Sequence, residues 1–161
     1  MKLSIFNKRR IVACLATTIV AVLSMLQPAS AAFSSAIDFF VANIKYTCYS
    51  EAAFSWDVST SQDIAVGCGY IGTYAGGAVA AGCMAAQGTL MIYESDDTFS
   101  HSISSGMLYS DRTTNIWMNM ADTPRVSGIR YRAQGLVMAL DDPVANNYIP
   151  MYTQIADPIT G

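Results

Sequence analysis

Apolar and polar residues alternate along several short stretches of the chain, and this alternation is its main structural signal. The stretches cover residues 44–49, 54–59, 99–103, 116–120 and 129–134. Successive side chains of a β-strand point to opposite faces, so each stretch predicts a half-buried strand. Clusters of Ser, Asp, Asn and Gly separate the stretches. The pattern therefore predicts a mainly β protein, built as an antiparallel sandwich or barrel.

One long segment, residues 64–93, contains no charged side chain and is rich in Gly and Ala. Two interpretations fit it. It forms either a hairpin that turns at residues 75–77, or a short helix over residues 77–87 followed by a strand over residues 89–93. Polar residues and glycines dilute its hydrophobicity below that of a membrane-spanning helix, so we expect no stable membrane insertion.

The same segment contains the spacing G-x-G-x-x-G at residues 67–72, with Glu94 further along. This spacing is typical of dinucleotide-binding turns, where the acid would hold a ribose hydroxyl. Only 67 residues follow Glu94, however, and they alternate like antiparallel strands instead of continuing a strand and helix series. We therefore interpret these glycines as positions of close backbone packing, and expect no cofactor.

The N-terminal residues have the three parts of a secretory signal peptide. Lys2, Lys8, Arg9 and Arg10 precede an apolar run over residues 11–26, and the small residues Ala29, Ser30 and Ala31 follow it. This order predicts a signal peptide over residues 1–31, with cleavage between Ala31 and Ala32. A single β-rich domain over residues 32–161 would then be secreted or periplasmic, in a compartment where thiols can oxidise.

Charge is scarce and mostly negative in the expected mature chain. Residues 32–161 hold five basic side chains against twelve acidic ones, a net charge of −7. A chain of this charge is a poor general ligand for nucleic acid or for anionic membranes.

Four of the five basic residues fall between Arg112 and Arg132. Alternation places Arg130, Arg132 and Gln134 on one face of a strand, so they form a candidate site for an anionic ligand or an acidic protein surface. The alternative is that aspartates of the fold neutralise the arginines; the candidates are Asp111, Asp122 and Asp141.

Three cysteines remain once Cys14 leaves with the signal peptide. A hairpin turning at residues 75–77 would place Cys68 opposite or diagonal to Cys83, which allows a disulfide between them. Cys48 would then be the free thiol, buried on the strand face that it shares with Ile44. Other pairings stay open at this stage.

His101 is the only histidine of the chain and therefore the one candidate for a histidine-dependent hydrolase. Alternation groups it with Phe99 and Ile103, so we expect a hydrogen-bonded histidine of the core instead. No metal-binding spacing occurs, and we expect no metal site.

These observations favour an exported, non-enzymatic protein that binds or assembles, such as a matrix- or host-facing module, a glycan binder, an inhibitor or a fibre subunit. A homo-oligomer is one form that it could take. Two alternatives remain: a small secreted hydrolase that uses His101 with a cysteine or carboxylate, and a secreted toxin or antibacterial protein whose charge-free segment acts at membranes.

Overall fold

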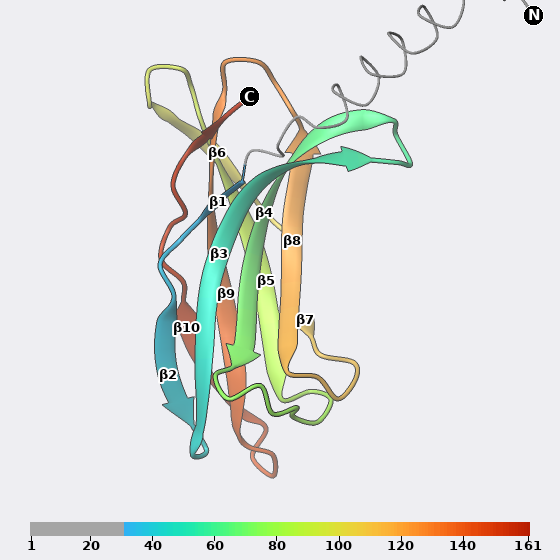
Figure 1. The fold of residues 1–161 in the computed structure, drawn as a ribbon, viewed down its shortest axis with the longest axis vertical. Coiled ribbons are helices and arrows are strands. Elements are labelled where there is room, and N and C mark those ends of the chain that lie inside the picture. The colour runs from blue at the N-terminus through green and yellow to red at the C-terminus, as the bar shows by residue number, and fades with distance from the viewer. Residues whose placement is uncertain (1–30) are drawn as a thin grey trace, which may run out of the picture.

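Two antiparallel sheets pack face to face in the computed structural model, which describes residues 31–161 (Figure 1). The expected signal peptide lies outside the described residues, apart from Ala31. The first sheet has the order β1-β3-β4-β8, and β2 also pairs with β3. Its strands are β1 (Ala31–Phe33), β2 (Ile37–Val41), β3 (Ile44–Asp57), β4 (Gln62–Thr73) and β8 (Ile116–Pro124).

The second sheet has the order β10-β9-β5-β6, with β11 also paired to β9 and β7 to β5. Its strands are β5 (Met84–Tyr93), β6 (Phe99–Ser104), β7 (Leu108–Tyr109), β9 (Arg130–Asp142), β10 (Asn147–Tyr152) and β11 (Ile159–Thr160). All pairings in both sheets are antiparallel, and the sheets do not close into a barrel. The expectation of a mainly β sandwich is confirmed.

The charge-free segment 64–93 forms neither the expected hairpin nor the expected helix. β4 pairs with β3 and β8 in the first sheet, whereas β5 pairs with β9, β6 and β7 in the second. The chain therefore crosses between the sheets at residues 74–83. Both strands lie inside their sheets and need apolar or small side chains on both faces, which explains the absence of charge. Among the described residues, no helix is long and apolar enough to cross a membrane.

Glycines bring the two sheets into backbone contact at the middle of the sandwich. A Cβ atom added at Gly69 of β4 would lie 2.5 Å from the carbonyl oxygen of Gln87 and 2.9 Å from the Cα atom of Gly135. A Cβ atom added at Gly67 would lie 2.8 Å from the Cα atom of Leu90. No L side chain fits between main-chain atoms at these distances. The packing interpretation of the glycine motif is therefore supported by the structure.

This glycine contact separates two clusters of buried side chains. One cluster includes Tyr46, Ile71 and Met84, and the other includes Leu90 and Tyr131. Most of their residues come from the inward-facing positions of β3, β4, β5 and β9, as the alternation predicted for Cys48 and Tyr131.

The C-terminal part of the chain belongs to the second sheet. Residues 143–146 form the turn between β9 and β10. Ile159 pairs with Tyr131 as part of β11 and is buried. The stretches 44–49 and 54–59 also belong mainly to one strand, β3, whose end carries the exposed Trp56.

Candidate functional site

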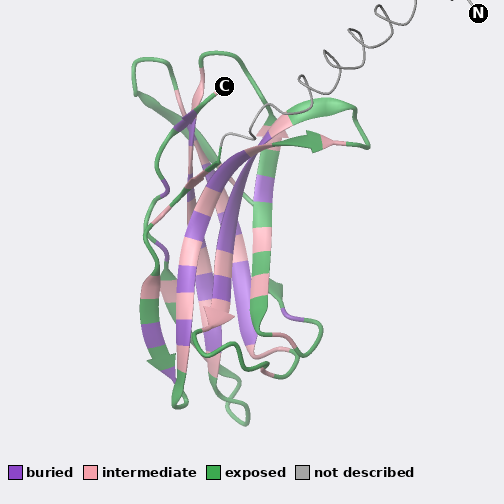
Figure 2. Cartoon of the chain, in the orientation of Figure 1, coloured by how far each residue is buried: buried purple, intermediate pink, exposed green. Residues whose placement is uncertain are grey.

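Part of the outer face of the first sheet, across β1, β3, β4 and β8, carries mainly apolar side chains, although no further layer of described residues covers it. We call it the apolar face. Figure 2 shows the exposed and half-buried positions along β8 beside the largely buried β4. The face consists of these side chains: Phe33, Tyr49, Val66, Cys68, Tyr70, Ile116, Met118 and Met120.

Strand register gathers these side chains from four strands. Tyr70 of β4 lies opposite Tyr49 of β3 on one side and opposite Met118 of β8 on the other. Cys68 lies opposite Met120 in the same way. Directly opposite residues point to the same face of a sheet, so the row continues across β3, β4 and β8.

Exposure on this face increases toward β8. Val66 and Cys68 are buried by their neighbours on the sheet, whereas Met118 and Met120 are 38% and 47% exposed and Ile116 is 50% exposed. Continuous exposed apolar surface is typical of an interaction site.

Aromatic stacking fixes the centre of the apolar face. The rings of Tyr49 and Tyr70 stack at 4.7 Å with an interplanar angle of 12°, and the Tyr70 hydroxyl donates a 2.6 Å hydrogen bond to Glu51. Burial, together with this hydrogen bond to the carboxylate, raises the pKa of Tyr70. Each of the two rings has one face covered by the other.

β8 is also an edge strand. It pairs with β4 on one side, and within residues 31–161 no strand pairs with its other side. Two hydrogen bonds to β4 flank β8. Just before β8, the Asn115 carbonyl accepts from the amide of Thr73, and just after it, the Arg125 amide donates to the Asp63 carbonyl. The main-chain groups of odd-numbered residues of β8 thus point toward β4. Because direction alternates along a strand, the groups of even-numbered residues, including Met118, point outward.

The expected arginine row exists on the outer face of the second sheet. Arg130, Arg132 and Gln134 lie opposite Tyr93, Met91 and Thr89 of β5. Arg130 forms an ion pair with Asp97, a different aspartate from the three considered in the sequence. The Arg132 guanidinium lies 5.6 Å from the centre of the Tyr93 ring, and no carboxylate of residues 31–161 pairs with it. Gln134 donates a hydrogen bond to the Thr153 carbonyl.

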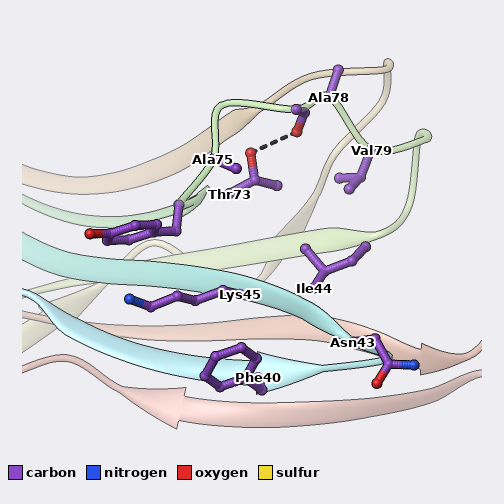
Figure 3. A pocket seen from close by; sticks show the side chains of 10 residues that line it. Phe40, Asn43, Ile44, Lys45, Thr73, Ala75, Ala78 and Val79 are labelled. Atoms are coloured by element: carbon purple, nitrogen blue, oxygen red, sulfur yellow. Dashed lines mark hydrogen bonds between the residues drawn. The ribbon is translucent and has the colours of Figure 1, made fainter.

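A third feature is an open pocket of about 430 Å³ between the β2–β3 turn and the loop that follows β4 (Figure 3). Phe40, Ile44 and Val79 are among its lining residues. Its one cation, Lys45, lies 2.7 Å from a carboxylate oxygen of Asp38 and 3.4 Å from the centre of the Tyr74 ring. The charge is thus engaged within the fold, and the pocket has few polar groups to orient a ligand.

The expected disulfide between Cys68 and Cys83 is not formed. It depended on a hairpin between β4 and β5, but these strands belong to different sheets, and Cys68 points to the outside of the first sheet. Cys48 is buried as expected. Burial raises the pKa of the Cys48 and Cys68 thiols to about 11, so neither is an activated nucleophile.

The expectation of a core histidine is wrong as well, because His101 is exposed on β6. Its side chain lies 3.2 Å from the Ser100 hydroxyl. Among the described residues, no carboxylate or thiol forms a hydrogen bond with it, and no cluster of three His, Cys, Asp or Glu side chains could hold a metal ion. β6 lies at the edge of the second sheet, where an inward-pointing side chain stays in contact with solvent.

A comparison of the chain with protein-family models, curated proteins and solved structures found no match in any of the three. Function must therefore be inferred from the surfaces themselves. Of these, sequence reasoning missed the apolar face. The alternation at residues 116–120 was visible, but it did not reveal that Trp117 faces the other sheet while the methionines face outward.

Proposed function

We propose that this protein is an exported, non-enzymatic assembly protein whose copies associate through the apolar face and its β8 edge. The observation that carries the proposal is the exposure of Ile116, Met118 and Met120 in continuity with the aromatic centre of the face. Burying such side chains contributes about 25 cal/mol for each Å² of apolar surface removed from water.

Two features of the described residues favour assembly over catalysis. Two groups at the apolar face that could act as acid or base, Glu51 and Tyr70, are hydrogen-bonded to each other. The exposed His101 lacks the carboxylate or thiol partner that the hydrolase alternative requires.

Sedimentation velocity of the purified exported protein, from micromolar to millimolar concentration, tests the proposal. We expect reversible association of the wild type and at least tenfold weaker association of Met120→Lys. Each copy carries a net charge of −7, so an added lysine lessens repulsion between copies. Weaker association of Met120→Lys would therefore result from the disrupted apolar contact and not from net charge.

Tyr152→Lys is the matched control. Tyr152 is 63% exposed on the outer face of the second sheet, and its replacement changes the net charge by the same amount. The control should associate like the wild type. A wild-type protein that remains monomeric throughout, or equal effects of the two lysines, would contradict the proposal.

A second candidate function is binding of an anionic ligand at the arginine row. It is supported by Arg132, whose guanidinium shares a face with Arg130 and Gln134 and has no carboxylate partner among the described residues. The ion pair of Arg130 with Asp97 weakens this candidate, since it removes half of the local positive charge.

A further inference from the structure

We infer that two copies pair β8 with β8 in antiparallel orientation, across a two-fold axis that passes beside Met118. The two first sheets would then form one continuous sheet. This inference rests on the proposed function and names its partner, a second copy of the chain, and its register.

The first argument is that β8 is the edge with the least protection. The opposite edge of the first sheet is divided between the short strands β1 and β2. In the second sheet β10 carries Pro150, and the edge beyond β5 is divided between β6 and the two-residue strand β7, with a register shift in the β5–β6 pairing. β8 has nine residues; Asp122 and Pro124 lie near its C-terminal end, and the stretch Ile116–Ala121 before them contains no charge and no proline. Natural sheets protect their edges with short strands, prolines, charges and bulges, so a long apolar edge is a site for strand pairing.

The second argument concerns the hydrogen bonds that the edge offers. Ile116 exchanges two hydrogen bonds with the Thr114 hydroxyl, and the amide of Met120 donates to Asn119 Oδ1 at 2.9 Å. Met118, between them, points outward with both its amide and its carbonyl. With a two-fold axis beside Met118, the Met118 amide of each copy donates a hydrogen bond to the Met118 carbonyl of the other copy. This is the reciprocal pair of bonds found in an antiparallel ladder.

The third argument is that the side chains match in this register. Met118 lies opposite Met118, and Ile116 lies opposite Met120, so every exposed apolar residue of the edge meets another one. A register shifted by one residue along each strand toward the C-terminus would place Ile116 opposite Asp122 instead. Apolar cross-strand pairs stabilise a sheet, whereas an isolated carboxylate against an apolar residue does not.

A fourth observation limits the length of the pairing. The amide of Thr114 donates to the Val79 carbonyl, and the Thr114 carbonyl accepts from the Val79 amide, so the edge before β8 is already occupied by the loop that follows β4. The pairing with a second copy therefore centres on the stretch from Ile116 to Met120, which lies beyond this bridge.

Cysteine cross-linking tests the register. The background for the test is Cys68→Ala with Cys83→Ser, because the native Cys68 lies directly opposite Met120 and would compete for a cysteine placed there. In this background, Met118→Cys should form a disulfide-linked dimer under mild oxidation. Directly hydrogen-bonded residues have Cα atoms about 5.5 Å apart, within the range of a disulfide. Met120→Cys should not cross-link to itself, because the two positions are displaced by four residues, about 13 Å along the strands. A mixture of Ile116→Cys and Met120→Cys should cross-link, and this pair keeps the test valid if Met118→Cys does not fold.

The outcomes separate the inference from the proposed function. Self-linking of Met118→Cys, without self-linking of Met120→Cys, supports the pairing. The register is wrong if the wild type associates in sedimentation but neither Met118→Cys nor the mixed pair cross-links. It is also wrong if Met120→Cys links to itself. In both cases assembly through the apolar face stands. If the wild type is monomeric in sedimentation, the proposed function and the inference both fail.

Discussion

Replacing Gly69 with alanine should destabilise the sandwich strongly, because the added methyl group has no space between the sheets. Its carbon would lie 2.5 Å from the Gln87 carbonyl oxygen and 2.9 Å from the Cα atom of Gly135. Both are main-chain atoms of the second sheet, so no side-chain rotation can relieve the contact. The two sheets would have to move apart, which would also loosen the two side-chain clusters on either side.

The size of the effect follows from known overpacking costs. Extra methylenes in a packed core cost about 1 to 3 kcal/mol where side chains can shift, and we expect at least about 3 kcal/mol for Gly69→Ala, where only backbone can move. An unfolding entropy of about 2.1 cal/mol/K per residue then predicts a Tm about 10 °C lower for a domain of this size.

Thermal unfolding followed by circular dichroism measures this shift, and Gly77→Ala is the control. Gly77 has no atom within 4 Å of an added Cβ, and its φ lies outside the left-handed region. Its replacement should leave Tm unchanged or raise it slightly, through the lower entropy of the unfolded chain. A Gly69→Ala variant that melts within about 2 °C of the wild type would refute the backbone contact between the sheets.

Three further predictions concern the covalent and charged groups. The intact mass of the protein should show no disulfide; a mass deficit of two hydrogens would show a bridge instead. Alkylation at mild alkaline pH should modify Cys83 first, because the pKa of the buried Cys48 thiol is raised to about 11. N-terminal sequencing of exported protein should begin at Ala32, and an intact N-terminus would refute export by cleavage. Arg130→Ser with Arg132→Ser should reduce retention on heparin at low salt; unchanged retention would show that the row is structural.

The strands themselves could be predicted where only one face is buried. Tyr131 and Ala133 face the core, and Arg130 and Arg132 face outward, as their alternation indicated. Such strands carry their orientation in the sequence, because a slip by one residue would bury the arginines.

Strands with two apolar faces carry no such information. In β4 the residues from Ala65 to Gly69 are all buried. The second sheet covers those that point to the inner face, and neighbouring side chains cover those that point to the outer face. The sequence of this segment was compatible with a hairpin, a helix and a strand. The expected pairing of Cys68 with Cys83 failed for this reason, since it required β4 and β5 to be neighbours.

The apolar face was hidden for a related reason. Trp117, Met118 and Asn119 show alternation, but its direction depends on which side the second sheet packs. The bulky Trp117 and the small Ala121 turn inward, and the methionines remain outside. Only the three-dimensional arrangement of the sheets shows that these methionines continue the row of Tyr49 and Tyr70.

Amide hydrogen exchange at Met118, measured by NMR at several protein concentrations, tests the central claim most directly. The Met118 amide points away from β4, so in dilute solution it should exchange quickly, whereas the neighbouring Asn119 amide, bonded toward β4, should exchange slowly throughout. Pairing of β8 with a second copy predicts that exchange at Met118 slows as concentration rises and the dimer forms. A Met118 exchange rate that stays fast at concentrations where the protein has associated would contradict strand pairing at this edge.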